Sequence, residues 1–270
     1  MSSVDPDVLL ANYRIVLEPG DTPATENTFK LMDDEEIFRM LDAFGHAIRS
    51  PERKVTGSLF IKRYSALAAG ALYAWIHHGC GLDVSLNRLA VTVEASGALR
   101  FHIADACVHE DCTADGERLW TEEEAGRTEA YLVSVFTTNV VPVFDSVIRY
   151  SDIPSSTLWS TLSYLFIYWK RKWLEQASSV AMRMRIEEVY GCLMSPVNTS
   201  FFDGCPVNPL TPSFRTIEDP LHSGCTIMLR SKCCMNYRLP GEDRYCYTCP
   251  AISDERKIEK YLAAHMVAQK

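Results

Sequence analysis

The feature that most constrains this sequence is a concentration of cysteines in its last 40 residues. Four of the ten cysteines form the pattern Cys-Cys-x11-Cys-x2-Cys, at Cys233, Cys234, Cys246 and Cys249. A Cys-x2-Cys pair places two thiolates on one tight turn, close enough to bind one metal ion or the two irons of one cluster. Adjacent side chains of an extended chain point to opposite faces. A bend is therefore needed before Cys233 and Cys234 can face one centre.

The cysteine spacing leaves three interpretations open. Four thiolates suffice for a [2Fe-2S] or [4Fe-4S] cluster and equally for one tetrahedral zinc ion. Buried thiols without a metal are the third interpretation, which the concentration of these four makes less attractive. The other cysteines lack paired spacing, and we predict that they are not ligands: Cys80, Cys107, Cys112, Cys192, Cys205 and Cys225. The stretch from Cys107 to Cys112 is predicted to be a polar loop rather than a metal site.

Composition and charge indicate a packed globular protein with an uneven charge distribution. Hydrophobic residues make up 47% of the chain and charged residues 23%, which excludes long disorder and low-complexity repeats. Residues 1–150 hold 23 acidic and 13 basic side chains, and residues 151–270 hold 12 and 14, so that only the second part is net positive. An acidic protein is a poor candidate for wrapping nucleic acid. A basic region within it can still receive an anion.

The sequence predicts a cytosolic chain. Its first residues have neither a basic head nor an apolar stretch, so no secretory signal is expected. No apolar run reaches the roughly 18 to 20 residues of a membrane-spanning helix. We therefore expect no transmembrane segment, and leave peripheral contact with a membrane open.

Apolar periodicity predicts an α+β fold, a mostly helical scaffold with a small antiparallel hairpin. Alternating residues over 89–94 and 99–103 predict the hairpin, a short β-like run covers 226–230, and a loop covers 198–220. Thr121 is expected to cap a helix that Pro142 kinks or ends, and Ser155 or Ser156 to cap another. Helical spacing is seen over 33–48, 63–78, 121–142, 155–173, 180–194 and 253–266.

The residues around the cysteines carry a family resemblance. The run from Cys233 to Pro240, which contains Tyr237-Arg238-Leu239-Pro240, is followed by Cys246-Tyr247-Thr248-Cys249-Pro250. Together they resemble the C-terminal signature of the FhuF-type ferric-siderophore reductases. Leu158-Trp159-Ser160 with Tyr164-Leu165 is similar to the central aromatic helix of that family. The family has ten residues between the cysteine pairs, whereas this chain has eleven. The extra residue lies in a turn-like stretch, so we expect the same ligands and a less certain cluster potential.

The resemblance implies the function and its residues. Cys233, Cys234, Cys246 and Cys249 would hold a [2Fe-2S] cluster in residues 206–270, with a terminal helix, while residues 1–205 form the scaffold and a chelate-binding region. The substrate would be a ferric siderophore, of hydroxamate type, which releases its iron on one-electron reduction. No acid, base or nucleophile is needed at the centre. No dinucleotide fingerprint is found, so a ferredoxin or a soluble reductant is the expected electron donor.

Positive charges near the cysteines are candidates for substrate binding. Arg230, Lys232 and Arg238 are expected to offset the cluster's negative charge or to attract an anionic chelate. The basic, aromatic stretch 168–173 could bind an anionic ligand, RNA or a membrane surface. Its helical spacing favours Trp169 and Trp173 as core anchors, with the cations in water.

Two other functions remain open from the sequence. One is a structural zinc-binding module that docks a protein or RNA. The other is an iron–sulfur electron carrier or redox sensor without affinity for siderophores.

Overall fold

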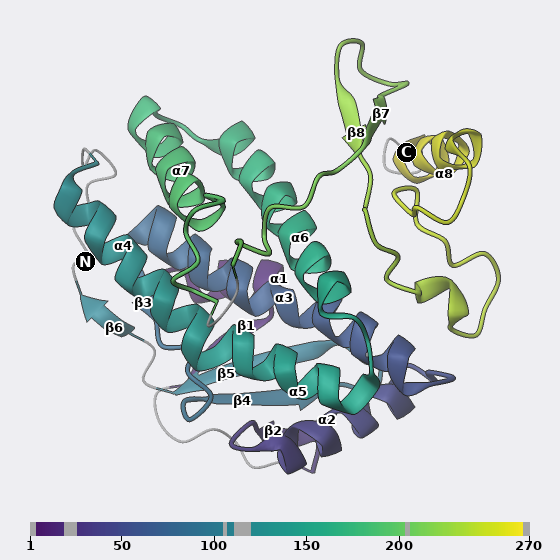
Figure 1. Cartoon of the computed structure of the whole chain (residues 1–270), viewed down its shortest axis with the longest axis horizontal. Helices are drawn as coiled ribbons and strands as arrows, with labels where there is room; N and C mark the ends of the chain where they lie inside the picture. Colours follow the sequence, from purple (N-terminus) through teal and green to yellow (C-terminus); the bar gives the residue numbers. More distant parts are fainter. Residues whose placement is uncertain (1–3, 19–25, 105–106, 111–119, 203–205, 267–270) are drawn as a thin grey trace.

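The computed structural model describes residues 4–18, 26–104, 107–110, 120–202 and 206–266, with the side chains of 107–110 and 266 left out. It confirms the α+β class (Figure 1). The helices are α1 (Pro6–Tyr13), α2 (Asp34–Ala47), α3 (Arg53–His78), α4 (Glu122–Val135), α5 (Val141–Ser151), α6 (Ser155–Gln176), α7 (Val180–Leu193) and α8 (Asp254–Met266). The strands are β1 (Ile15–Glu18), β2 (Thr28–Lys30), β3 (Cys80–Leu82), β4 (Leu89–Val93), β5 (Leu99–Ala104), β6 (Cys107–Glu110), β7 (Thr216–Glu218) and β8 (Thr226–Met228).

A four-stranded sheet of order β1-β5-β4-β2 supports the helical body. Its centre is the predicted hairpin, in which β4 and β5 pair antiparallel with Val91 opposite Phe101. Gly97 turns the hairpin at a φ of +75°, a backbone conformation that glycine adopts at little cost. β1 pairs parallel to β5, and β2 pairs antiparallel to β4. The segments of β1, β2 and α1 were not foreseen, because each is too short for a clear periodicity.

α3 is the central helix and begins ten residues earlier than its predicted start at residue 63. The first turns contain Gly57 and Ser58, which interrupt the apolar stripe that the prediction relied on. They are buried because α5 approaches closely, with a Cβ at Gly57 falling 2.4 Å from Ser151 Oγ. The C-terminal cap at Gly79 is as expected, with a φ of +63°.

α4 and α5 form one helical run, Glu122–Ser151, joined by a π-helical segment over Phe136–Val140. Thr121 caps its start by accepting a hydrogen bond from the Glu124 N–H, as predicted. Pro142 does not end the run, because the π-helical turn before it accommodates the lost backbone hydrogen bond. By length and apolarity this run could cross a membrane, whereas the sequence analysis expected no such segment. However, 56% of its most apolar window is buried inside the protein. A buried core helix has the same composition.

α6, α7 and α8 follow the predicted ranges closely, with one difference at the start of α6. Pro154 precedes that helix, which has no side-chain cap from Ser155 or Ser156. Ser179 caps α7 by accepting from Met182 N–H. The predicted loop 198–220 contains one short strand, β7, which pairs with β8. The sequence of β7 did not predict a strand, because this strand forms through backbone hydrogen bonds to β8.

The C-terminal segment, residues 206–266, contains β7, β8 and α8. It lies to one side of the helical body, next to α6 (Figure 1). It has a small core of its own, in which Ile227, Leu229 and Tyr261 pack together. Cys234 and Leu239 instead join the main core. The proposed division at residues 205 and 206 stays a prediction, and residues 203–205 lie outside the described ones.

Candidate functional site

The four predicted ligands lie on the segment between β8 and α8, whose described helical structure is one 3₁₀ turn, η2 (Asn236–Arg238). Cys234 and Cys249 are buried, whereas Cys233 and Cys246 are half-buried. Met235 directly follows the cysteine pair and has a φ of +58°, in the left-handed region. Such a conformation is unfavourable for a side chain with a Cβ. It bends the chain directly after the two adjacent cysteines.

The thiols are arranged as two pairs. Cys233 Sγ lies 3.5 Å from Cys249 Sγ, and Cys234 is hydrogen-bonded to Cys246. Each pair thus joins one of the adjacent cysteines to one member of the Cys-x2-Cys turn. In the described part of the chain, no group of three or more His, Cys, Asp or Glu side chains is arranged to hold a metal ion.

Each of the four sulfurs accepts a hydrogen bond from the residue two positions further along the chain. The Met235 N–H donates to Cys233 Sγ at 3.4 Å, and the Ala251 N–H donates to Cys249 Sγ at 3.5 Å. The Asn236 N–H donates to Cys234, and Thr248 Oγ1 donates to Cys246 Sγ at 3.6 Å. Hydrogen bonds of this kind stabilise thiolates and tune the potentials of thiolate-bound clusters.

Arg230 places a buried positive charge beside these thiols. Only 8% of this residue is exposed, and its Nε and Nη1 atoms have no hydrogen-bond partner. A buried, unpaired guanidinium is costly unless a negative charge compensates it. The hydrogen bond from Cys246 lowers the pKa of Cys234 to about 5, and the positive charges of Lys62 and Arg230 add to this effect. The surroundings therefore favour negative charge at Cys234, whereas the hydrogen bond to Cys234 raises the pKa of Cys246 and burial raises the pKa of Cys233 to about 12.

Residues of α6 connect the helical body to residues 229–252, which carry the four cysteines and which we call the cysteine segment. Ser160 Oγ lies 2.6 Å from Ser231 Oγ, and Tyr164 donates a hydrogen bond to the Met228 carbonyl at 3.3 Å. The Arg230 guanidinium stacks over the Tyr164 ring, 4.2 Å from its centroid. Ser160 and Tyr164 belong to the run that is similar to the central aromatic helix of the FhuF-type family. This similarity therefore marks the helix that contacts the cysteine segment.

The three predicted substrate-binding cations occupy different environments. Arg230 is buried as described, whereas Lys232 is exposed. Arg238 is also exposed and forms an ion pair with Glu52 at the start of α3. Their role in binding stays a prediction, and the sequence could not show the Glu52 partner of Arg238, which lies 186 residues away along the chain.

The cysteines predicted not to be ligands lie elsewhere, where they are described. Cys80 is buried in β3, Cys192 is half-buried on α7, and Cys225 is exposed; all three are free thiols. The backbone of Cys107 belongs to β6, which pairs with β3, so the stretch begins with a strand and not with a loop. Cys112 and Cys205 lie outside the described residues, and their predicted role remains untested.

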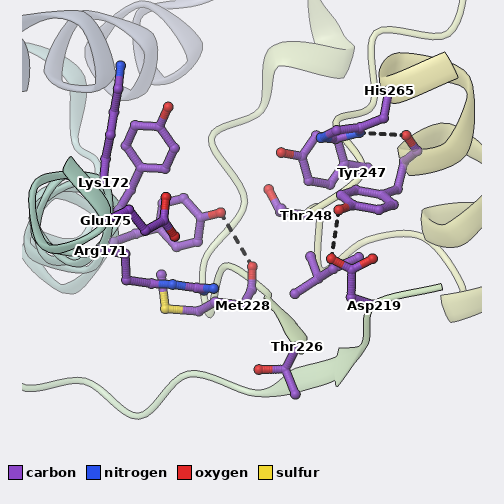
Figure 2. Close-up of a pocket in the computed structure, with 13 residues that line it drawn as sticks. Arg171, Lys172, Glu175, Asp219, Thr226, Met228, Tyr247, Thr248 and His265 are labelled. Atoms are coloured by element: carbon purple, nitrogen blue, oxygen red, sulfur yellow. Dashed lines mark hydrogen bonds between the residues drawn. The ribbon is translucent and has the colours of Figure 1, made fainter. Parts of the chain in front are cut away.

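The sequence did not reveal a groove between α6 and the C-terminal segment, which we call the α6 groove. Tyr164, Tyr168, Arg171 and Lys172 line one side of it, and Asp219, Tyr247 and Thr248 line the other (Figure 2). Tyr168, Arg171 and Lys172 of the basic, aromatic stretch therefore face this groove. Trp173 is fully buried and Trp169 packs against the core, as predicted.

Fold and site together define an α+β protein with a four-cysteine centre beside a buried arginine. The sequence profile of the family described as "Ferric iron reductase FhuF-like transporter" matches residues 58–203, more than half of the chain. The chain belongs to this family, as the sequence resemblance suggested. The match spans α3 to α7 and ends before the cysteine segment. No curated protein matches the chain.

Proposed function

We propose that this protein is a cytosolic ferric-siderophore reductase in which Cys233, Cys234, Cys246 and Cys249 hold a [2Fe-2S] cluster. Membership of a ferric iron reductase family supports the reaction class. The observation that carries the proposal is the buried guanidinium of Arg230, whose Nε and Nη1 have no hydrogen-bond partner, acting on the hydrogen-bonded thiols of Cys234 and Cys246.

The residues present fit such a group. A cluster bound by four thiolates is negatively charged, and Arg230 and Lys62 supply the compensating charge at the buried pair. The two thiol pairs suit a centre with two irons, since each iron takes two thiolates. The four donors to sulfur are already in place without any change in the backbone. A cluster bound there would supply one electron at a time, which is what the reduction of Fe(III) to Fe(II) consumes.

Reduction frees the iron because siderophores hold Fe(III) far more tightly than Fe(II). The protein then needs no acid, base or nucleophile at the centre. Its own residues hold the cluster, exclude water from the Cys234 side, and bring the chelate close. The electron donor we propose is a separate ferredoxin or a soluble reductant.

The test is spectroscopic and kinetic on the full chain, purified without oxygen. We expect visible absorption of a [2Fe-2S] centre, two irons and two sulfides per chain, and bleaching on reduction. Adding a ferric siderophore should restore the absorption while a ferrous-specific chelator traps Fe(II). Cys246→Ala should abolish both properties. Cys225→Ala, which removes an exposed cysteine outside the site, is the matched control.

Other outcomes favour the two alternatives. A colourless protein with one zinc ion per chain would identify a structural zinc module. An absorbing protein whose reduced form is not reoxidised by any ferric siderophore would identify an electron carrier or redox sensor.

A further inference from the structure

The α6 groove is a cavity of about 370 Å³, within the size range of small-molecule sites. Its walls are rich in rings, from Tyr164 and Tyr168 on α6 and from Tyr247, Tyr261 and His265 across the opening (Figure 2). Tyr168 is 48% exposed although its ring is largely apolar. The groove thus offers flat aromatic surfaces that are not covered by the protein itself.

Within the described residues, the two cations of the groove lack an ion-pair partner, whereas one of its two carboxylates is engaged in hydrogen bonds. Among the residues that the structure describes, neither Arg171 nor Lys172 has an ion-pair partner, and Lys172 lies over the Trp169 ring at 4.8 Å. Asp219, on the opposite wall, already accepts hydrogen bonds from the Tyr261 hydroxyl at 2.8 Å and from the Leu221 N–H at 2.8 Å. It also pairs with His222. Glu175 is the second carboxylate of the lining, and in the described part of the chain its side chain has neither a hydrogen bond nor an ion pair.

The groove and the cysteine site share a wall. Tyr247 and Thr248 are the two residues between Cys246 and Cys249, and both line the groove. The Thr248 hydroxyl also donates a hydrogen bond to Cys246 Sγ. Tyr164 lines the groove, and the Arg230 guanidinium stacks on the Tyr164 ring. A molecule in the groove would therefore be separated from the thiols by a single layer of side chains.

We propose that the α6 groove binds the ferric chelate, and that it prefers chelates of net negative charge with flat aromatic donor groups, such as catecholates. The proposal rests on the reductase function proposed above and adds the place and the charge class of its substrate. It departs from the hydroxamate-type chelate expected from the sequence, because an anionic chelate can pair with Arg171 and Lys172 and a neutral one cannot. Binding itself makes and breaks no bond. The redox step transfers one electron from the reduced centre to Fe(III), giving Fe(II) and the oxidised centre.

Binding can be measured apart from electron transfer with gallium(III) chelates, since Ga(III) replaces Fe(III) without being reduced. The probes are the anionic gallium tris-catecholate and a neutral gallium tris-hydroxamate, titrated calorimetrically into the full chain. We expect the anionic probe to bind at least tenfold more tightly, with an affinity that falls as salt is added. Equal affinity for the two probes would overturn the charge preference.

Arg171→Glu tests the groove, and Arg183→Glu is its matched control. Arg183 is an exposed arginine on α7 that does not line the groove, so both variants change the total charge equally. We expect Arg171→Glu to weaken binding of the anionic probe at least tenfold and to leave the visible spectrum unchanged, with Arg183→Glu resembling the wild type. Thr226→Trp, which fills the groove without changing its charge, should also weaken binding. If Arg171→Glu and Thr226→Trp both bind like the wild type, the groove is not the site.

The failure of the groove and the failure of the reductase function give different results. If both groove variants reduce a ferric catecholate as fast as the wild type, the groove proposal fails and the function stands. If the wild type binds the gallium probe in the groove but does not reduce the ferric chelate, the binding site stands and the reductase function fails.

Discussion

At the scale of single residues, Arg230 is buried with unpaired donors next to the thiols, so its charge acts through a medium of low polarity. Removing it in Arg230→Met should disfavour the more negative, reduced state of a bound cluster. We expect the reduction potential to fall by on the order of 60 mV, which is tenfold in the equilibrium constant for one electron. A redox titration followed by visible absorption measures this shift.

Lys232→Met is the control for Arg230→Met, because it removes an exposed cation from the same segment. Water and salt screen that charge, so its effect on the potential should be much smaller. Equal shifts in the two variants would show that burial of Arg230 does not matter for the potential.

His77 predicts a pH dependence of stability. Burial lowers its pKa from 6.5 to about 4, and the neighbouring charges of His78 and Arg185 contribute. Between these two pH values the unfolded chain binds a proton that the folded chain does not. The contribution to stability is therefore complete above pH 6.5 and is lost as the pH falls toward 4, by on the order of 3 kcal/mol.

The measurement is urea unfolding at pH 7.5 and pH 4.5. His77→Gln should lose less stability between the two pH values than the wild type does, although the lowered pKa of His78 leaves some dependence. His46→Gln removes an exposed histidine from α2 and is the control. An unchanged pH dependence in His77→Gln would contradict the assignment.

At the scale of elements, the close contact between α3 and α5 depends on Gly57. A Cβ there would lie 2.4 Å from Ser151 Oγ and 2.7 Å from Ser151 Cβ, so one helix must move. We expect Gly57→Ala to destabilise the protein by about 1 to 3 kcal/mol in urea unfolding. Gly126→Ala on α4 has no atom within 4 Å and should stabilise it by up to about 1 kcal/mol. Equal effects would refute the packing argument.

The elements also show which parts of the fold could be predicted. α2 and α7 have one buried face, and their ranges follow from apolar spacing alone. α3 is buried on nearly all sides, so small residues such as Gly57 hide its first turns from any periodicity. The β7 strand has an exposed, polar sequence and exists through its pairing with β8.

The same contrast holds for the site. The four predicted ligands are close in sequence, so their spacing was sufficient to single them out as candidates. The α6 groove joins Arg171 to Asp219 and Tyr247, which are 48 and 76 residues further along the chain. Arg171 is exposed, as expected for the cations of the basic stretch, but its place in a groove could not be predicted because nothing local shows what lies opposite α6.

At the scale of the whole molecule, the helical body and the cysteine segment differ in how they are held. The body has an extensive buried core, whereas residues 229–252 have little regular structure and form hydrogen bonds to their own cysteine sulfurs. A metal or cluster bound by these thiols would add cross-links that the body does not need. We therefore expect Cys246→Ser to increase amide hydrogen exchange in residues 229–252 while α3 and α5 stay protected. Cys192→Ser, on α7 in the body, is the control and should leave exchange in the cysteine segment as it is in the wild type. Faster exchange throughout the chain in Cys246→Ser would instead mean that body and segment unfold as one unit, which would also contradict a domain boundary near residue 205.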